Sequence, residues 1–403
     1  VGHSVQPGDV VVCNVDLVVG HDANRPQPLE IFAQMGGTRV FDPQKIKLFI
    51  DHAATVPNRS VAQVHQVMRT FASEQGIELF RSGDGISHQI VAERRFASPG
   101  GLVVGSDSHT CTQGGLNLFA TGVGSSDMAV AMLTGQLWFK VPESIQVRLE
   151  GALRPGVYAK DVALSLTRRL GADGANWCAL EFTGPGLSCL TIGDRMTICN
   201  MAIETGAKTG IFEADQVLAE WHGGEVGFPV RPDPEAVYKQ VVVLDLSALE
   251  PCVAAPHAVE NVLPVSELSG TVIDQALIGT CTNGRLADLE EAARILRGRR
   301  IHPRVRMFVT PASREVFEQA IASGAISTLV QAGATILTPS CAGCTGGGFC
   351  GIPADGERVI TAANRNFRGR LGNPNAFLYL ASPATVAASA IAGEIVDCRT
   401  YLL

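Results

Sequence analysis

TPSCAGCTGGGFCG, residues 338–351, places Cys341 and Cys344 in a C-x-x-C pair between an apolar run and a glycine-rich turn. Well upstream, GTCTNG at 279–284 places Cys281 directly after another apolar run. We interpret these three cysteines as one site. Three thiolates on an iron–sulfur cube leave one iron without a protein ligand, and such an iron can act as a Lewis acid, whereas a fully Cys-ligated cluster suits electron transfer.

A C-x-x-C pair by itself is a weak signal, and two other interpretations stay open. A structural zinc site would need a fourth Cys or His at standard spacing, and Cys350 supplies a further candidate. A redox dithiol of the thioredoxin type would need the pair at the start of a helix. The glycines at 346–348 do not favour a helix start.

The composition limits the possible partners of the chain. Its 403 residues predict two to three domains, and with 46% hydrophobic and 18% charged residues it is poorer in charge than most globular proteins. A net charge of -7 argues against nucleic acid as the main partner. The eleven cysteines, an odd number, indicate a reducing compartment. No apolar run of ~18 residues and no leader sequence is present, so we expect no membrane partner and a cytoplasmic location.

Alternating apolar strand-like and helical segments predict an α/β fold. Changes in texture and proline-rich stretches divide the chain into residues 1–142, 143–265 and 266–403. Apolar spacing predicts helices at 60–77 and 159–170, a helix around 127–137, and another that opens at Asn200.

Four apolar runs end in clusters of polar residues. In open α/β sheets, ligands bind beyond the carboxyl ends of the strands, so these clusters predict one convergent site. The clusters are Asp51-His52, Ser106 to His109, Thr280 to Asn283, and Ser340 to Cys344.

In these residues and their motifs, the chain resembles the aconitase superfamily, and within it the large subunits of 3-isopropylmalate dehydratases. The resemblance covers nearly the whole chain. Its motifs are GSDSHT at 105–110, GTCTNGR at 279–285, CAGC at 341–344 and NRNFRGR at 364–370. It implies three α/β/α domains of the aconitase type around a central cleft, with the fourth, swivelling domain absent.

The resemblance also implies a cofactor and a set of functional residues. A [4Fe-4S] cluster would be held by Cys281, Cys341 and Cys344. The matching catalytic positions are Asp51, His52, His88, Asp107, His109 and Glu204. The matching substrate-binding positions are Ser108, Asn200, Asn283, Asn364, Arg365 and Arg370.

These residue types suit the dehydration of a hydroxy acid, which needs a proton removed from carbon and a hydroxyl turned into a leaving group. We expect His52 to be the acid, with Asp107, His109 and Glu204 as its supporting network. Arg365 and Arg370 would hold substrate carboxylates through forked hydrogen bonds. The alternatives are structural: capped helix starts for the Asp-His and Asp-Ser-His pairs, a core histidine at 88, and a solvated face for the arginines.

In the resembled family the base that removes the carbon proton is a serine on the fourth domain. Nothing before Leu403 resembles that domain, so the resemblance predicts a separate small swivel-domain subunit that supplies the serine. The expected substrate is a small hydroxy di- or tricarboxylic acid, with isomerisation of 2- and 3-isopropylmalate as the leading reaction. A homoaconitase, a dehydratase of methylmalate-type acids, and a non-catalytic iron-sensing protein on the same fold remain alternatives. Cys350 matches no ligand of the family.

Overall fold

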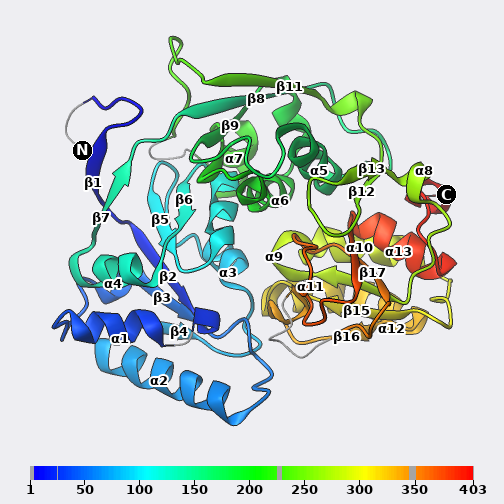
Figure 1. Cartoon of the computed structure of the whole chain (residues 1–403), viewed down its shortest axis with the longest axis horizontal. Coiled ribbons are helices and arrows are strands. Elements are labelled where there is room, and N and C mark those ends of the chain that lie inside the picture. The colour runs from blue at the N-terminus through cyan, green and yellow to red at the C-terminus, as the bar shows by residue number, and fades with distance from the viewer. Residues whose placement is uncertain (1–3, 25, 225–228, 345–350, 403) are drawn as a thin grey trace.

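The computed structural model describes residues 4–24, 26–224, 229–344 and 351–402. Three largely parallel sheets and one two-stranded ribbon make up its β-structure (Figure 1). The mixed α/β class expected from the sequence is confirmed. None of the described helices is both long and apolar enough to cross a membrane.

The first sheet is parallel, with strand order β4-β3-β2-β5-β6. Val18, Leu48 and Val104 face a core shared with α1, α2 and α4, whereas Leu17 and Phe49 face the opposite core. Burial on both faces explains why the central strands β2 and β5 are nearly continuous apolar runs. The elements are β2 (Leu17–His21), η1 (Asp22–Asn24), α1 (Gln27–Gln34), η2 (Pro43–Lys45), β3 (Ile46–Phe49), α2 (Arg59–Gln75), β4 (Glu78–Phe80), α3 (Ser87–Glu93), β5 (Leu102–Gly105), η3 (Ser108–Leu116), β6 (Phe119–Gly122) and α4 (Ser125–Thr134).

An antiparallel ribbon of β1 (Val10–Asn14) and β7 (Gln136–Lys140) flanks this sheet. The expected helix around 127–137 was too long at its carboxyl end. Gly135 adopts the left-handed conformation with φ of 70° and caps α4, and the chain then turns into β7.

The second sheet is parallel, with order β10-β9-β8-β11. Its elements are β8 (Ser144–Glu150), α5 (Ala159–Leu170), β9 (Ala179–Thr183), η4 (Pro185–Cys189), α6 (Ile192–Asn200), η5 (Ala202–Thr205), β10 (Thr209–Phe212), α7 (Gln216–His222), β11 (Gln240–Asp245) and η6 (Leu246–Ala248). The expectation that Asn200 opens a helix was wrong. Thr191 and Asp194 form a capping box that starts α6 earlier, so Asn200 ends that helix and Glu204 lies in η5.

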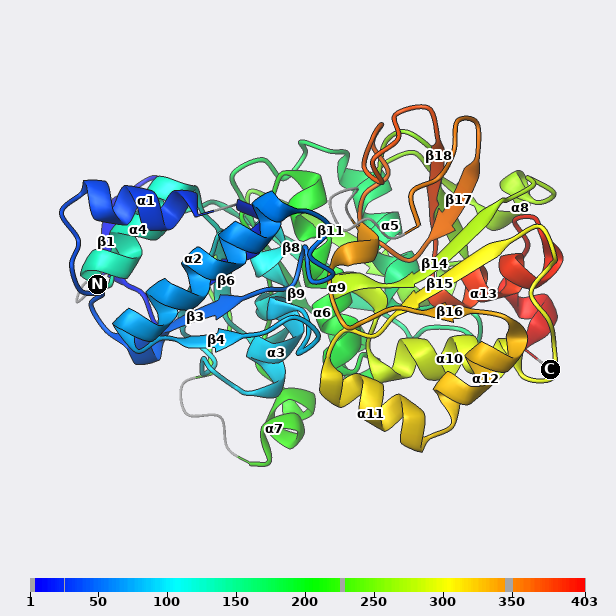
Figure 2. The same ribbon diagram turned by 90° about the horizontal axis from the view of Figure 1, so that it is seen from below.

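The third sheet has the order β13-β12-β18-β17-β14-β15-β16, with β12 antiparallel to both of its neighbours. Helices α10, α11 and α12 lie together along one side of it (Figure 2). The elements are β12 (Cys252–Ala254), β13 (Val262–Pro264), α8 (Val265–Leu268), β14 (Gln275–Gly279), α9 (Thr280–Asn283), α10 (Leu286–Leu296), β15 (Arg306–Thr310), α11 (Arg314–Ala322), α12 (Ala325–Ala332), β16 (Thr335–Ile336), η7 (Ala342–Cys344), β17 (Arg358–Thr361), β18 (Phe377–Leu380), α13 (Pro383–Ala392) and η9 (Cys398–Tyr401).

The pairing of β12 with β18 bears on the division of the chain. The sequence predicted a boundary near residue 265, which groups β12 and β13 with the second unit, but both strands belong to the third sheet. We propose on this ground that the third unit begins near residue 250.

The first and second units meet along η3, which packs against α6 and β10. A Cβ atom at Gly114 would lie 1.6 Å from the carbonyl oxygen of Gly210. Only glycine permits the two backbones to approach this closely. The glycine pair in the 3-10 helix after His109 therefore seats the second unit against the loop that carries the candidate catalytic residues.

Candidate active site

Cys281, Cys341 and Cys344 come together in the structure, where each is at least 96% buried. The sulfur of Cys341 is within hydrogen-bonding reach of the sulfurs of both Cys281 and Cys344. These hydrogen bonds hold the pKa of Cys281 well below that of a free thiol and lower the pKa of Cys344 to about 5, while they raise that of Cys341. All the cysteines described by the structure are free. Three buried thiols, two of them inclined to ionise, are the donors that an iron–sulfur group requires.

Neighbouring side chains donate hydrogen bonds to these sulfurs. Asn200 Nδ2 lies 3.2 Å and Asn364 Nδ2 3.4 Å from the sulfur of Cys281, and an Arg370 guanidinium nitrogen lies 2.8 Å from that of Cys344. Such N–H donors stabilise thiolate over thiol and tune a metal group bound to it. The residues present therefore fit the cluster that the resemblance implies.

Asp107 lies at the centre of a group of histidines. Its carboxylate oxygens are 3.2 Å from His52 Nε2, 3.4 Å from His88 Nε2 and 3.3 Å from His109 Nδ1. Burial alone would keep this carboxyl neutral, but hydrogen bonds from His109, His52 and His88 hold its pKa well below the usual range. Asp107 is thus an anion that can hold His52 and His109 in their protonated form.

His52 receives a second carboxylate on its other ring nitrogen, because His52 Nδ1 lies 2.7 Å from Asp51 Oδ1. Burial opposes the charge on His52, but the carboxylates of Asp51 and Asp107 outweigh it and raise its pKa well above 6.5. The backbone N–H of Ser87, at the start of α3, donates to the other Asp51 oxygen at 2.8 Å. A protonated imidazole held on both sides is the arrangement expected of a general acid.

The second unit contributes Glu204, which joins His109 to Arg365. Glu204 Oε1 is 2.9 Å from His109 Nε2, and Arg365 Nε lies 2.8 and 3.0 Å from the two Glu204 oxygens. Burial lowers the pKa of His109, yet Asp107 and Glu204 raise it to about 9. In the described hydrogen bonds Arg365 uses only Nε, which leaves its two terminal nitrogens for a ligand carboxylate.

The remaining predicted residues divide into two groups. Asn200, Asn364 and Arg370 contact the cysteine sulfurs, as described above, and Ser108 is the partly buried first residue of η3. Asn283, in contrast, donates to Asp288 Oδ1 at 2.9 Å at the start of α10, and none of its described hydrogen bonds reaches the histidines. Cys350 lies outside the described residues.

His21 and Asp22 belong to this site, and our sequence reasoning placed them in a polar loop. His21 is 93% buried and stacks on the ring of His52 with centroids 4.4 Å apart. Its Nε2 lies 3.9 Å from Asp107 Oδ2 and has no hydrogen-bond partner in the described part of the chain. The signal that could have found them is the position at the carboxyl end of a strand, because His21 is the last residue of β2 and Asp22 follows it.

By spacing alone, His21, Asp22, Asp51 and His52 form a group able to hold a metal ion, with ligand atoms within 4.8 Å of one another. Asp22, however, is already satisfied. Its oxygens accept bonds of 2.9 Å from the N–H groups of His52 and Ala53 and of 3.0 Å from His65 Nε2. Asp22 therefore orders the Asp51-His52 turn without needing an ion.

A backbone contact brings the histidines and the cysteines together. The N–H of Cys341, in the third unit, donates to the carbonyl oxygen of Asp51, in the first unit, at 2.7 Å. This bond joins the turn that carries His52 directly to the segment that carries Cys341 and Cys344.

Comparisons with known proteins agree with this geometry. The aconitase family model (aconitate hydratase) matches residues 2–272 and 266–393. The chain therefore belongs to the aconitase family. Aconitase X from Thermococcus kodakaraensis has the same fold, with a TM-score of 0.52 at 12% identity over 88% of this chain and 84% of that one.

Much nearer relatives share a more specific name. The chain is 47% identical to 3-isopropylmalate dehydratase large subunit 1 of Methanopyrus kandleri, over 100% of this chain and 97% of that protein. It is also 47% identical to the protein of the same name from Thermotoga maritima, with 100% and 97% covered. A large subunit 2 from Archaeoglobus fulgidus is 48% identical, with 98% and 95% covered.

The raised pKa of His52 gives a prediction for its partner. In Asp51→Asn the imidazole loses the nearer of its two carboxylates, so its pKa should fall. Because the protonated form exists only below that pKa, the alkaline limb of the pH–rate profile should move to lower pH, by about 1 to 3 units. Histidine titration by NMR on the chain provides the direct measurement. An unmoved alkaline limb with an unmoved His52 titration would contradict the assigned pairing.

Proposed function

We propose that this chain is the large catalytic subunit of a hydro-lyase that interconverts 2-isopropylmalate and 3-isopropylmalate by dehydration and rehydration. The observation that carries the proposal is the meeting of three buried thiols with a carboxylate-flanked histidine, joined by the bond from Cys341 to Asp51. The names of the full-length relatives supply the substrate.

We further propose that Cys281, Cys341 and Cys344 hold a [4Fe-4S] cluster. When bound, such a cluster supplies a Lewis-acidic iron that polarises the substrate hydroxyl. The hydrogen bonds from Asn200, Asn364 and Arg370 to the sulfurs would hold the ligands in their thiolate form. The free thiols and the absence of a disulfide among the described cysteines suit a reducing, cytoplasmic setting.

The protein's own residues divide the acid–base work. His52, held protonated by Asp51 and Asp107, would give its Nε2 proton to the departing hydroxyl. Glu204 fixes Arg365 through its Nε, so that the terminal nitrogens can form a forked pair with a substrate carboxylate. His109, bound at both nitrogens, would keep Asp107 and Glu204 in place.

Dehydration also needs a base that removes the carbon-bound proton of the substrate, and none of the residues described above has been given this role. The relatives are named large subunits, so we propose a small partner subunit, and from the family resemblance we infer that it supplies a serine as that base. The substrate would bind between the two subunits, and the small subunit would contact the substrate side chain and determine the selectivity for it.

The test is reconstitution. The chain, loaded anaerobically with iron and sulfide and mixed with its small subunit, is expected to interconvert the isopropylmalates and to contain about four irons per chain. Homocitrate, citrate and methylmalate serve as competing substrates. If elemental analysis found zinc in place of iron, the proposed cofactor would be wrong. If the complex preferred another acid, the proposed substrate would be wrong.

A further inference from the structure

Lys160 is a buried cation that the proposed chemistry does not use. Its side chain is 0% exposed, and it lies in the first turn of α5. Burial disfavours an ammonium, and so does the positive end of the helix dipole. Burial lowers the pKa of Lys160 to about 8, although the thiols of Cys344 and Cys281 oppose this. Because burial of the ammonium is unfavourable by itself, its hydrogen bonds must compensate for the lost solvation.

The partners of Lys160 are two backbone carbonyls in another unit. Its Nζ donates to the oxygen of Ala362 at 3.0 Å and to that of Ala363 at 2.6 Å. These alanines follow β17 and directly precede Asn364 and Arg365. The side chain of Asn364 then contacts Asn200 and Cys281, and Arg365 binds Glu204. Lys160 therefore holds the backbone from which both side chains project.

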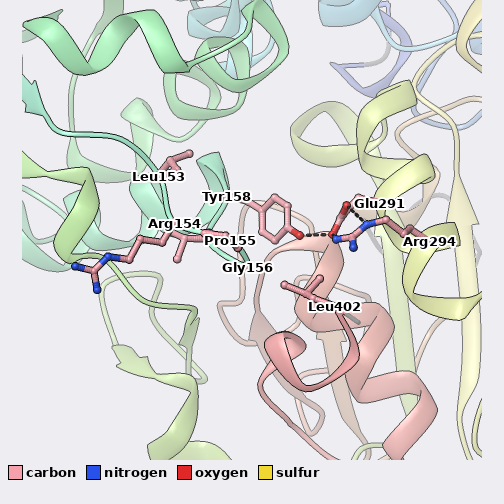
Figure 3. A pocket seen from close by; sticks show the side chains of 9 residues that line it. Leu153, Arg154, Pro155, Gly156, Tyr158, Glu291, Arg294 and Leu402 are labelled. Atoms are coloured by element: carbon pink, nitrogen blue, oxygen red, sulfur yellow. Dashed lines mark hydrogen bonds and ion pairs between the residues drawn. The ribbon is translucent and has the colours of Figure 1, made fainter.

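Helix α5 is firmly placed between the second and third sheets. Val162 packs in the core of the second sheet, whereas Ala163 and Leu164 pack against β12 and β13 of the third. Tyr158, the residue before α5, donates its hydroxyl to Glu291 on α10 beside an open surface cavity of about 460 Å³ (Figure 3). The packing of Val162, Ala163 and Leu164 on both units is enough to give the ammonium that α5 carries a defined position.

We propose that Lys160 is a positioning residue for substrate binding, which holds the 362–363 backbone so that Arg365 meets a substrate carboxylate in the correct orientation. This inference rests on the proposed function for the identity of the substrate. The described hydrogen bonds of Lys160 go to these two carbonyls and not to a cysteine sulfur.

The test replaces Lys160 by methionine, which has nearly the same length and no donor. In the reconstituted complex, K160M should raise KM for 3-isopropylmalate about tenfold or more while kcat falls by less than about threefold, because only carboxylate binding is disturbed. Iron content should equal that of the wild type. Lys160→Gln, which keeps a donor, should recover part of the loss. Tyr158→Phe is the matched control, since it removes a contact of the same helix without touching the two carbonyls, and its KM should be unchanged.

A double-mutant cycle separates positioning from a general structural role. If Lys160 acts through Arg365, adding K160M to Arg365→Lys should raise KM little beyond the larger single effect. If the two residues act independently, the fold-increases in KM of the single variants should multiply in the double variant. A wild-type KM in K160M, or multiplicative effects, would overturn the inference. If K160M does not fold, the same cycle with K160Q decides, and a wild-type KM there also overturns it. A wild type that does not act on isopropylmalate instead contradicts the proposed function.

Discussion

Cys281→Ser is expected to lose its iron and more than ~100-fold of its activity, since weakening only the outer partners of a metal ligand already costs about 10- to 100-fold. Cys281 is the thiol held in ionised form by Cys341 and by two asparagine amides. A serine hydroxyl at this position would not ionise, so one of the three ligands would be gone. The measurement is iron and sulfide content per chain, followed by turnover in the reconstituted complex.

A matched control is available in the same chain. Cys398 is also buried, but burial raises the pKa of its thiol to about 12, and its sulfur donates to the carbonyl oxygen of Gly156 at 3.4 Å. A serine can make the same bond, so Cys398→Ser should keep full iron content and activity. Equal iron in the Cys281 and Cys398 variants would contradict the assignment of the three-cysteine site.

His52→Asn is expected to reduce kcat by about 10² to 10⁴-fold, the usual loss when a general acid is removed. The asparagine amide can still donate to Asp51, so the turn after β3 should persist, and substrate binding through Arg365 should be retained. KM should therefore change far less than kcat, and the iron content should not change. Steady-state kinetics on the iron-loaded complex measure both quantities.

The control for this variant is a histidine outside the site. His222 ends α7, where the carbonyl oxygens of Trp221 and His222 accept bonds from Arg95, and it lies apart from Asp107 and its partners. His222→Gln should leave kcat unchanged. A loss of kcat in the His222 variant equal to that in the His52 variant would show that the effect is structural.

Much of the fold could be predicted because the local signals were strong. Helix α2 ends before Gly76, and α5 spans 159–170 as its apolar spacing predicted. The predicted helix bounds were wrong where a capping residue, and not the apolar spacing, fixed the end of the helix. Gly135 ends α4 earlier than predicted, and the capping box at Thr191 starts α6 upstream of Asn200. Strand pairing, a long-range property, placed β12 and β13 in the third sheet, which no local pattern indicates.

By itself, the sequence determined the residue types of the site: the three cysteines and the Asp-His and Asp-Ser-His clusters at strand ends, and the two arginines of the motif at 364–370. Their motifs sufficed to indicate the family, because each motif is a short stretch in which the functional side chains lie on one local turn and are therefore close in the sequence. Only the tertiary structure decided how they meet. It stacked His21 on His52, bonded Arg370 to Cys344, turned Asn283 toward Asp288, and placed Lys160 of α5 against the carbonyls that precede Asn364. These contacts join segments far apart in the chain, and their energies depend on burial and on neighbouring charges, which exist only once the sheets have packed.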